Sequence, residues 1–273
     1  MLASVLTWLS DPWAQAIGRR ALLEVVLLGA SGGLLGAWLV TYDLAYSAES
    51  LAHALLPGLV GAALLGLPLL LGGAAGLLVA ALGVALAGRI EGLGRDTAVA
   101  VVVTTLFGLG ALLALSPDTP AGLQSLLFGD VLGVSDSDLA LAGGLVLVLA
   151  LALLVLHPRL LLVGFDRAGA AALGTRPVLV DVALLVLLAV ALLVAVQGLG
   201  NLLVVAVLIA PASAARLVTR RMGQMLAVSV AFAVLAGVAG MYLSYHAGTA
   251  AGASIALALV ATYALAAGVA KLR

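Results

Sequence analysis

The sequence contains no cysteine and only one lysine, Lys271, among its 273 residues. Without cysteine, neither disulfides nor thiolate metal sites can form, so a transition metal has to be held by nitrogen and oxygen ligands. A single lysine near the C-terminus excludes a glycine-rich loop ending in Gly-Lys-Ser or Gly-Lys-Thr, and with it nucleotide binding through a P-loop. The sequence also lacks the His-Glu-x-x-His signature of zinc proteases.

Charge is scarce along the whole chain. Only 9% of the residues are charged and 65% are hydrophobic, and the mean hydropathy is +1.32. The surface of a soluble domain needs far more charge. Apolar runs of about 20 residues, the length of a membrane-spanning helix, recur from Ala21 onward without the alternation of a β-barrel. We therefore predict an all-α, polytopic transmembrane bundle that forms a single integral membrane domain, residues 1–273.

The apolar runs predict nine spans, and eight or ten remain compatible with the short gaps between some of them. The N-terminal segment 1–18 has no basic start and contains Asp11 and Pro12, so we expect an interfacial segment with Trp8 and Trp13 rather than a cleaved signal peptide. The predicted spans are Arg20–Val40, Ala45–Gly66, Pro68–Ala87, Thr97–Leu115, Leu139–Leu156, Val178–Val196, Asn201–Val218, Gln224–Tyr245 and Ala250–Ala270.

The basic residues predict the orientation of the chain. With these spans, ten of the 12 basic residues fall on one side, which the positive-inside rule assigns to the cytoplasm. Arg19 and Arg20 are the exception, because they fall outside with the N-terminus. The opposite loop, Ser116–Asp138, contains four aspartates, including Asp130, and no basic residue. This loop either attracts cations to the outer mouth or is simply a solvated external loop.

The longest predicted cytoplasmic connection, residues 157–177, contains a candidate short helix, Phe165–Gly174. Asp166 gives this segment an acidic start, alanines such as Ala168 and Ala171 give it a small face, and Gly174 gives it a stop. It is either a plain connector or a helix that fits a partner's groove.

Glu49 and His53 are the most informative polar residues, since they lie four positions apart inside an apolar segment, Ser47–Gly58. Residues at this spacing share one face of a helix, with Cβ atoms roughly 5 to 6 Å apart, so both side chains can reach one cation. Carboxylate and imidazole are ligands common to zinc, manganese and ferrous iron. The alternative is that the pair only fixes packing, although ionisable groups inside a membrane are by default functional.

Other polar positions are less specific. Asn201 opens the seventh span, where helix capping and gating are both compatible with it. His246, at the outer end of the eighth span, is either an entry ligand or a structural interfacial histidine.

Four segments resemble, in order, the motifs of permease subunits from ABC-type importers of zinc, manganese and iron. The first, Ala48–Gly58, is similar to the family's Gly-Asp-Ala-x-Ser-His-x-x-Leu-Pro-Gly motif, and the other three are Asp96–Gly110, Leu127–Ser135 and Gly200–Ala212. Order and spacing agree from about Gly29 to Thr262. The chain departs from the family at Glu49, where Asp is usual, at Asp130, where Asn is common, and at Tyr42-Asp43, which replaces a basic stretch.

The resemblance implies a homodimeric, multi-pass permease in a prokaryotic plasma or inner membrane. It also implies two cytoplasmic ATPase subunits, which bind the ATP, and an extracellular or periplasmic metal-binding protein. The transported zinc, manganese or iron is substrate, and no permanently bound cofactor is expected. By the resemblance Glu49 and His53 would bind the metal. Asp130 in the acidic loop and His246 at the end of its span are further candidates from their positions in the sequence. Phe165–Gly174 would be the coupling helix, with Phe165, Asp166, Ala168, Ala171 and Gly174 at the ATPase.

Two other function classes are compatible with a polar pair in a membrane. An intramembrane metal-dependent hydrolase would need a third and fourth ligand and a fixed water, which the sequence does not obviously supply. An ion-coupled secondary transporter would need carboxylates in the spans and often an inverted repeat, and no clear repeat is visible.

Overall fold

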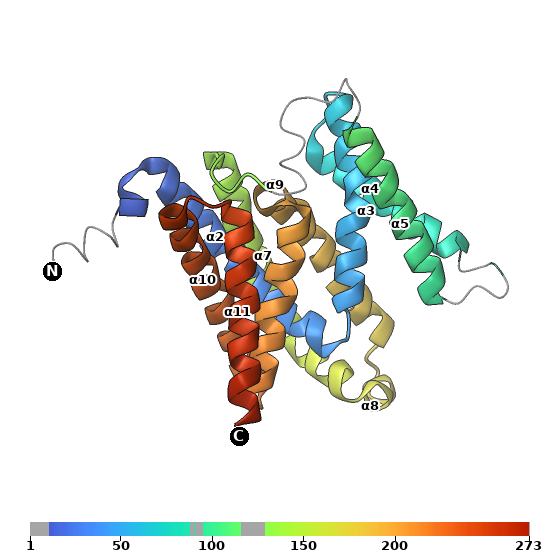
Figure 1. The fold of residues 1–273 in the computed structure, drawn as a ribbon. Helices are drawn as coiled ribbons and strands as arrows, with labels where there is room; N and C mark the ends of the chain where they lie inside the picture. The colour runs from blue at the N-terminus through green and yellow to red at the C-terminus, as the bar shows by residue number, and fades with distance from the viewer. Residues whose placement is uncertain (1–10, 88–89, 91–94, 116–128, 273) are drawn as a thin grey trace.

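The computed structural model describes residues 11–87, 90, 95–115 and 129–272, and predictions for Trp8, Arg89 and Asp118 lie outside these ranges. The described part of the chain forms helices joined by short connections and contains no strand. The helices are α2 (Ala16–Thr41), α3 (Ala45–Leu64), α4 (Leu69–Ala87), α5 (Arg95–Ala114), α7 (Asp136–Phe165), α8 (Arg167–Ala172), α9 (Pro177–Val218), α10 (Met222–Ala247) and α11 (Ala251–Lys271) (Figure 1).

Each predicted span falls on one of these helices, and the all-α, multi-pass prediction is confirmed. Among the described residues, six helices are long and apolar enough to cross a membrane: α2, α5, α7, α9, α10 and α11. Helix α4 provides a shorter apolar stretch, Leu69–Val84, which is below the length of these six helices.

Helix α9 accounts for two predicted spans because it is broken at Gly200. Its 42 residues would extend roughly 63 Å if straight, at about 1.5 Å per residue, which is twice the hydrocarbon thickness. Gly200 has φ 76° and ψ 162°, a conformation that is essentially restricted to glycine. Ala191 and Leu208, on opposite sides of the break, line the same small cavity. The chain therefore folds back on itself at Gly200.

Helix α2 forms the centre of the main bundle and packs against α7, α9 and α10. Its Leu35, Trp38 and Leu39 are fully buried. A side chain at Gly33 would meet the backbone of Val230 on α10 within 2.7 Å, and one at Gly36 would collide with the carbonyl of Leu208 on α9. Small residues let membrane helices approach this closely, so α2 is held by backbone proximity as well as by its large side chains.

Helices α3, α4 and α5 form a second group beside this bundle (Figure 1). Helix α3 packs against both α4 and α5 and contacts α9 on its other side. It continues through Pro57 to Leu64. Helix α3 therefore connects the two groups and carries Glu49 and His53 at their junction.

Helix α7 is longer than predicted and shortens the cytoplasmic connection. The sequence analysis ended this span at Leu156, whereas the helix continues through Pro158 to Phe165. Leu160 and Val163 are fully buried in this extension, and the Tyr42 hydroxyl donates a hydrogen bond of 2.8 Å to the Leu160 carbonyl. Burial and this contact stabilise the extra turns despite the missing N–H of proline.

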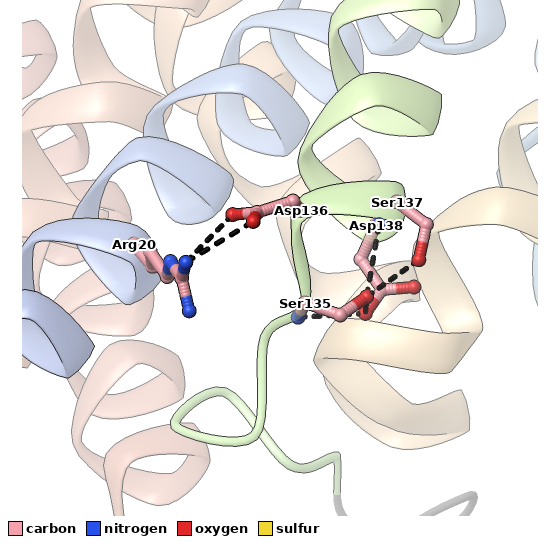
Figure 2. Close-up of polar contacts among 5 residues, drawn as sticks. All are labelled: Arg20, Ser135, Asp136, Ser137 and Asp138. Atoms are coloured by element: carbon pink, nitrogen blue, oxygen red, sulfur yellow. Dashed lines mark hydrogen bonds and ion pairs between the residues drawn. The ribbon is translucent and has the colours of Figure 1, made fainter.

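The two ends of the bundle are formed by different elements. Helix α8 and the C-terminus lie at one end, and the start of α7 lies at the other (Figure 1). At the second end, Arg20, an exception to the predicted orientation, forms an ion pair of 2.9 Å with Asp136 (Figure 2). Asp138 lies beside it and closes a capping box with Ser135 at the start of α7. The end that carries Asp136 and Asp138 thus supplies a partner for Arg20.

Candidate metal-binding site

Glu49 and His53 face each other on α3, as their spacing predicts. The His53 Nε2 and Glu49 Oε1 atoms are 4.0 Å apart. Two metal–ligand bonds of about 2.1 Å each span up to about 4.2 Å, so one cation between these atoms can contact both. The geometry therefore fits a shared divalent metal.

The imidazole of His53 is held by residues from two other helices. Its ring packs at 4.7 Å and 63° against the ring of Phe107 on α5. Its Nδ1 lies 3.3 Å from the side-chain amide of Asn201, which opens the second arm of α9. His53, Phe107 and Asn201 come from three of the four motifs in the sequence analysis. The structure thus brings motifs that are far apart in the chain together around one ring.

Asn201 can determine which nitrogen of His53 is available to a metal. It is 1% exposed, and its Oδ1 accepts no hydrogen bond from the described residues, so Asn201 does not act as a side-chain cap. A carboxamide presents either oxygen or NH₂ to its neighbour. In the structure Nδ2 of Asn201 faces His53 Nδ1, and Oδ1 of Asn201 has no hydrogen-bond partner among the described residues. If the carboxamide is turned over so that Oδ1 accepts from Nδ1, the imidazole carries its proton on Nδ1 and turns the lone pair of Nε2 toward Glu49. Asn201 is then a positioning residue rather than a cap.

Glu49 lines an open groove of about 490 Å³ between α3, the second arm of α9 and α11. The carboxylate side chain is 58% exposed, whereas His53 is 24% exposed. We refer to this feature as the α3–α9 groove, and its lining consists of Ala45, Tyr46, Glu49, Val205, Ala206, Ile209, Ala210, Ser213 and Tyr263. Glu49 therefore opens onto the surface of the chain, whereas His53 does not line the groove.

Glu49 and His53 have no third histidine or carboxylate beside them in the part of the chain that the structure describes. Within the described ranges, no three histidine, aspartate or glutamate side chains come close enough to hold one metal ion. Asp130 lines a different cavity, with Glu24 and Asp138. His246 lies in an aromatic group at the end of α10, with ring centroids 6.2 Å from Tyr242 and 5.1 Å from Tyr245. Neither Asp130 nor His246 lines the α3–α9 groove.

The sequence analysis missed three residues of these sites. It assigned no role to Phe107 or Glu24, and it considered Asn201 only as a cap or a gate. Glu24 had a usable signal, since a carboxylate inside the apolar run Ala21–Leu28 is unusual in a membrane helix. Phe107 had none, because an aromatic residue in an apolar span is ordinary.

The predicted coupling segment forms the short helix α8. The Asp166 carboxylate accepts a hydrogen bond of 2.9 Å from the Gly169 N–H at its start, and Gly174 follows its end with φ 83°. Ala168 and Ala171 are exposed, and Phe165 is 74% exposed. The acidic start and glycine stop form as predicted, and α8 presents an uncovered apolar surface.

An ion pair fixes α8 to the bundle. The Arg167 guanidinium donates two hydrogen bonds, of 2.6 and 3.2 Å, to the Asp181 carboxylate on α9. These bonds and the charge of Asp181 raise the pKa of Arg167. Burial and the charge of Asp181 raise the pKa of nearby Tyr42 to about 12, although the charge of Arg167 acts in the opposite direction. Arg167 is therefore charged and Tyr42 neutral at physiological pH.

Comparison with known proteins identifies the family. A model described as the ABC 3 transport family matches residues 15–270. The chain is 31% identical over 266 residues to a probable iron transport system membrane protein of Haemophilus influenzae, covering 97% of this chain and 98% of that protein. It is 32% identical over 249 residues to the manganese transport system membrane protein MntC of Halalkalibacterium halodurans, covering 91% and 85%.

A solved structure agrees over almost the whole chain. PsaBC from Streptococcus pneumoniae in complex with Fab matches with a TM-score of 0.88 and 27% identity, covering 97% of this chain and 95% of that one. An inward-facing structure of a metal-chelate type ABC transporter has the same fold, with a TM-score of 0.67 and 18% identity. With the family model matched from residue 15 to residue 270, the chain belongs to the ABC 3 transport family.

Proposed function

We propose that this chain is the permease subunit of an ATP-driven importer that carries a divalent transition metal ion across a prokaryotic cell membrane. The observation that carries the proposal is the Glu49–His53 pair, whose ligand atoms lie 4.0 Å apart beside an open groove. Relatives in the same family are named for the transport of manganese and iron. Zinc uses the same two ligand types, so the pair accepts all three metals.

A second copy of the chain completes the site in this proposal. One protomer contributes one nitrogen and one carboxylate, whereas a four-coordinate metal needs four ligand atoms. If two α3–α9 grooves face each other, the second Glu49 and His53 supply the missing pair. The path of the metal then lies between two copies, which fits the exposure of Glu49 on the protomer surface.

The partners follow from what the chain contains. It has no P-loop lysine, so ATP is hydrolysed by separate cytoplasmic subunits that dock on the exposed face of α8, including Phe165, Ala168 and Ala171. An external binding protein delivers the metal to the acidic outer end, where Asp130 attracts it. Two ligands per protomer hold the metal weakly enough for release, which transport requires.

A metal-resolved uptake assay tests the proposal. A strain lacking the chain is complemented with the wild type or with His53→Ala, and uptake of Mn²⁺, Zn²⁺ and Fe²⁺ is measured separately. We expect the wild type to restore uptake of at least one metal and the variant to restore none, with an ATPase co-purifying in both cases. Restored uptake by a well-expressed His53→Ala variant would overturn the site, and the absence of a co-purifying ATPase would overturn the assembly.

A further inference from the structure

Glu24 is a buried carboxylate that the proposed transport site does not use. It lies in the outer part of α2 and is 2% exposed. Its Oε2 atom has no hydrogen-bond partner in the part of the chain that the structure describes. A buried carboxylate without a partner is strongly unfavourable in a protein interior, and an ionisable group inside a membrane helix usually serves function.

A cavity of about 230 Å³ lies against this carboxylate. It is lined by Glu24, Leu69, Asp130, Gly133, Val134, Asp138, Gln197 and Gly198. Three of these residues are acidic, and no lysine or arginine is among them. Arg20, the nearby cation, is already paired with Asp136, which does not line the cavity (Figure 2).

Each acidic side chain keeps an oxygen available for a ligand. Asp130 uses Oδ1 to accept the Gly133 N–H at 3.0 Å, and Asp138 uses Oδ2 in the capping box with Ser135. Gln197 donates its amide N–H to the Leu193 carbonyl at 3.2 Å, which leaves its side-chain oxygen as an acceptor. Oxygens of this kind are the ligands of hard divalent cations.

The fold also makes room for the Glu24 carboxyl at this position. A Cβ atom at position 198 would collide with Glu24, so Gly198 allows the carboxyl to lie against the first arm of α9. Three residues later, Asn201 contacts His53. The cavity and the Glu49–His53 pair thus contact α9 at residues before and after its break at Gly200.

We propose that Glu24, Asp130, Asp138 and Gln197 form an outer site for a hydrated divalent cation, separate from the Glu49–His53 pair. The carboxylates do not converge closely enough to coordinate one bare ion, so the ion keeps most of its water and is held through it. At roughly 30 Å³ per water, the cavity has room for such an ion. Because the site offers oxygen alone, it binds Mn²⁺, Ca²⁺ and Mg²⁺ without selecting among them. This inference rests on the proposed transport function and gives the metal a first position on its route.

The test measures Mn²⁺ binding to the purified full-length chain in lipid nanodiscs. The variant Glu49→Gln/His53→Ala removes the inner site, and the Mn²⁺ that remains bound reports the outer site. In the Glu49→Gln/His53→Ala variant, we expect the additional change Glu24→Gln to weaken Mn²⁺ binding about tenfold or more. Residues that hold a metal indirectly, through the groups bound to it, typically have effects of this size. Asp11→Asn is the matched control, because it removes an exposed carboxylate that does not line the cavity, and binding should stay within about twofold.

A competition experiment gives a second readout. Excess Ca²⁺ should displace Mn²⁺ from the outer site in the Glu49→Gln/His53→Ala variant, and bound Mn²⁺ should keep the spectroscopic signature of an ion surrounded by water. If Glu24→Gln misfolds, Asp130→Asn at the exposed rim replaces it with the same expectation. The proposal is overturned if the background variant binds no Mn²⁺, if Glu24→Gln or its replacement leaves binding unchanged, or if Asp11→Asn weakens it equally.

The proposed function fails in a different way. If Glu49→Gln/His53→Ala imports metal normally, the inner transport site is wrong, whereas the Mn²⁺ binding measurement on the outer site is unaffected.

Discussion

Glu24 and Glu49 are the same residue type on neighbouring helices, yet their surroundings are opposite. Glu24 is 2% exposed beside a cavity lined by residues of one chain, whereas the Glu49 side chain is 58% exposed on an open groove. Glu49 has an imidazole beside it, and the polar side chains that share the cavity with Glu24 are Asp130, Asp138 and Gln197. The difference indicates that one chain can form the proposed site at Glu24 alone, whereas the proposed site at Glu49 is open to ligands from a second copy.

The largest effect is expected at the open groove. His53→Ala should reduce metal uptake to background, because a sparse site of nitrogen and oxygen ligands loses its only nitrogen. The helix tolerates alanine, so expression and ATPase co-purification should be unchanged. Uptake by the complemented strain, normalised to membrane protein, measures this. Wild-type uptake would place the transport site elsewhere.

The next expected effect separates metal binding from its coupling to ATP. Ala171→Glu places a charge on the exposed face of α8. A docked ATPase would bury this charge without a partner, which weakens the free energy of docking by on the order of several kcal/mol. ATPase co-purification and uptake should fall together, while Mn²⁺ binding persists.

The control for this variant is Ala247→Glu, the same substitution at an exposed position at the far end of α10. It should leave ATPase co-purification and uptake unchanged. If Ala171→Glu retains its ATPase and transports normally, α8 is only a connector.

A third prediction tests charge against length at Glu49. Glu49→Gln should transport about tenfold less than Glu49→Asp, because glutamine keeps the size but loses the charge that compensates a cation in a low-dielectric path. Uptake rates of the two variants at equal expression decide this. Equal transport by Glu49→Gln and the wild type would make the carboxylate a packing group.

The smallest effect is expected at the residue that orients His53. Asn201→Ala should raise the Mn²⁺ concentration for half-maximal uptake about tenfold, in the range for partners that position a metal ligand. The maximal rate should change less, because Asn201 orients His53 and does not itself bind the metal. An equal loss of maximal rate and apparent affinity would indicate a purely structural role.

The sequence predicted the helical segments well because its signal is local. Continuous apolar runs favour a helix of membrane length wherever they occur. Seven of the nine predicted runs each correspond to one long helix, and the other two correspond to the two arms of α9. The i, i+4 spacing of Glu49 and His53 was sufficient to place their side chains together. Gly174 and Asp166 determined the ends of α8 for the same reason, since caps act over three or four residues.

Tertiary structure decided everything that depends on contacts between distant segments. The Asn201–His53 contact joins residues 148 positions apart, and the close approach of α2 and α9 at Gly36 depends on how two helices pack. The extension of α7 past Pro158 followed from burial of Leu160 and Val163, which overcame a local helix-breaking signal. Sequence alone indicated that Glu24 was unusual. Only the packing of α2 against α7 and the α9 break placed its carboxylate in a cavity with Asp130 and Asp138, because burial is a property of the whole fold.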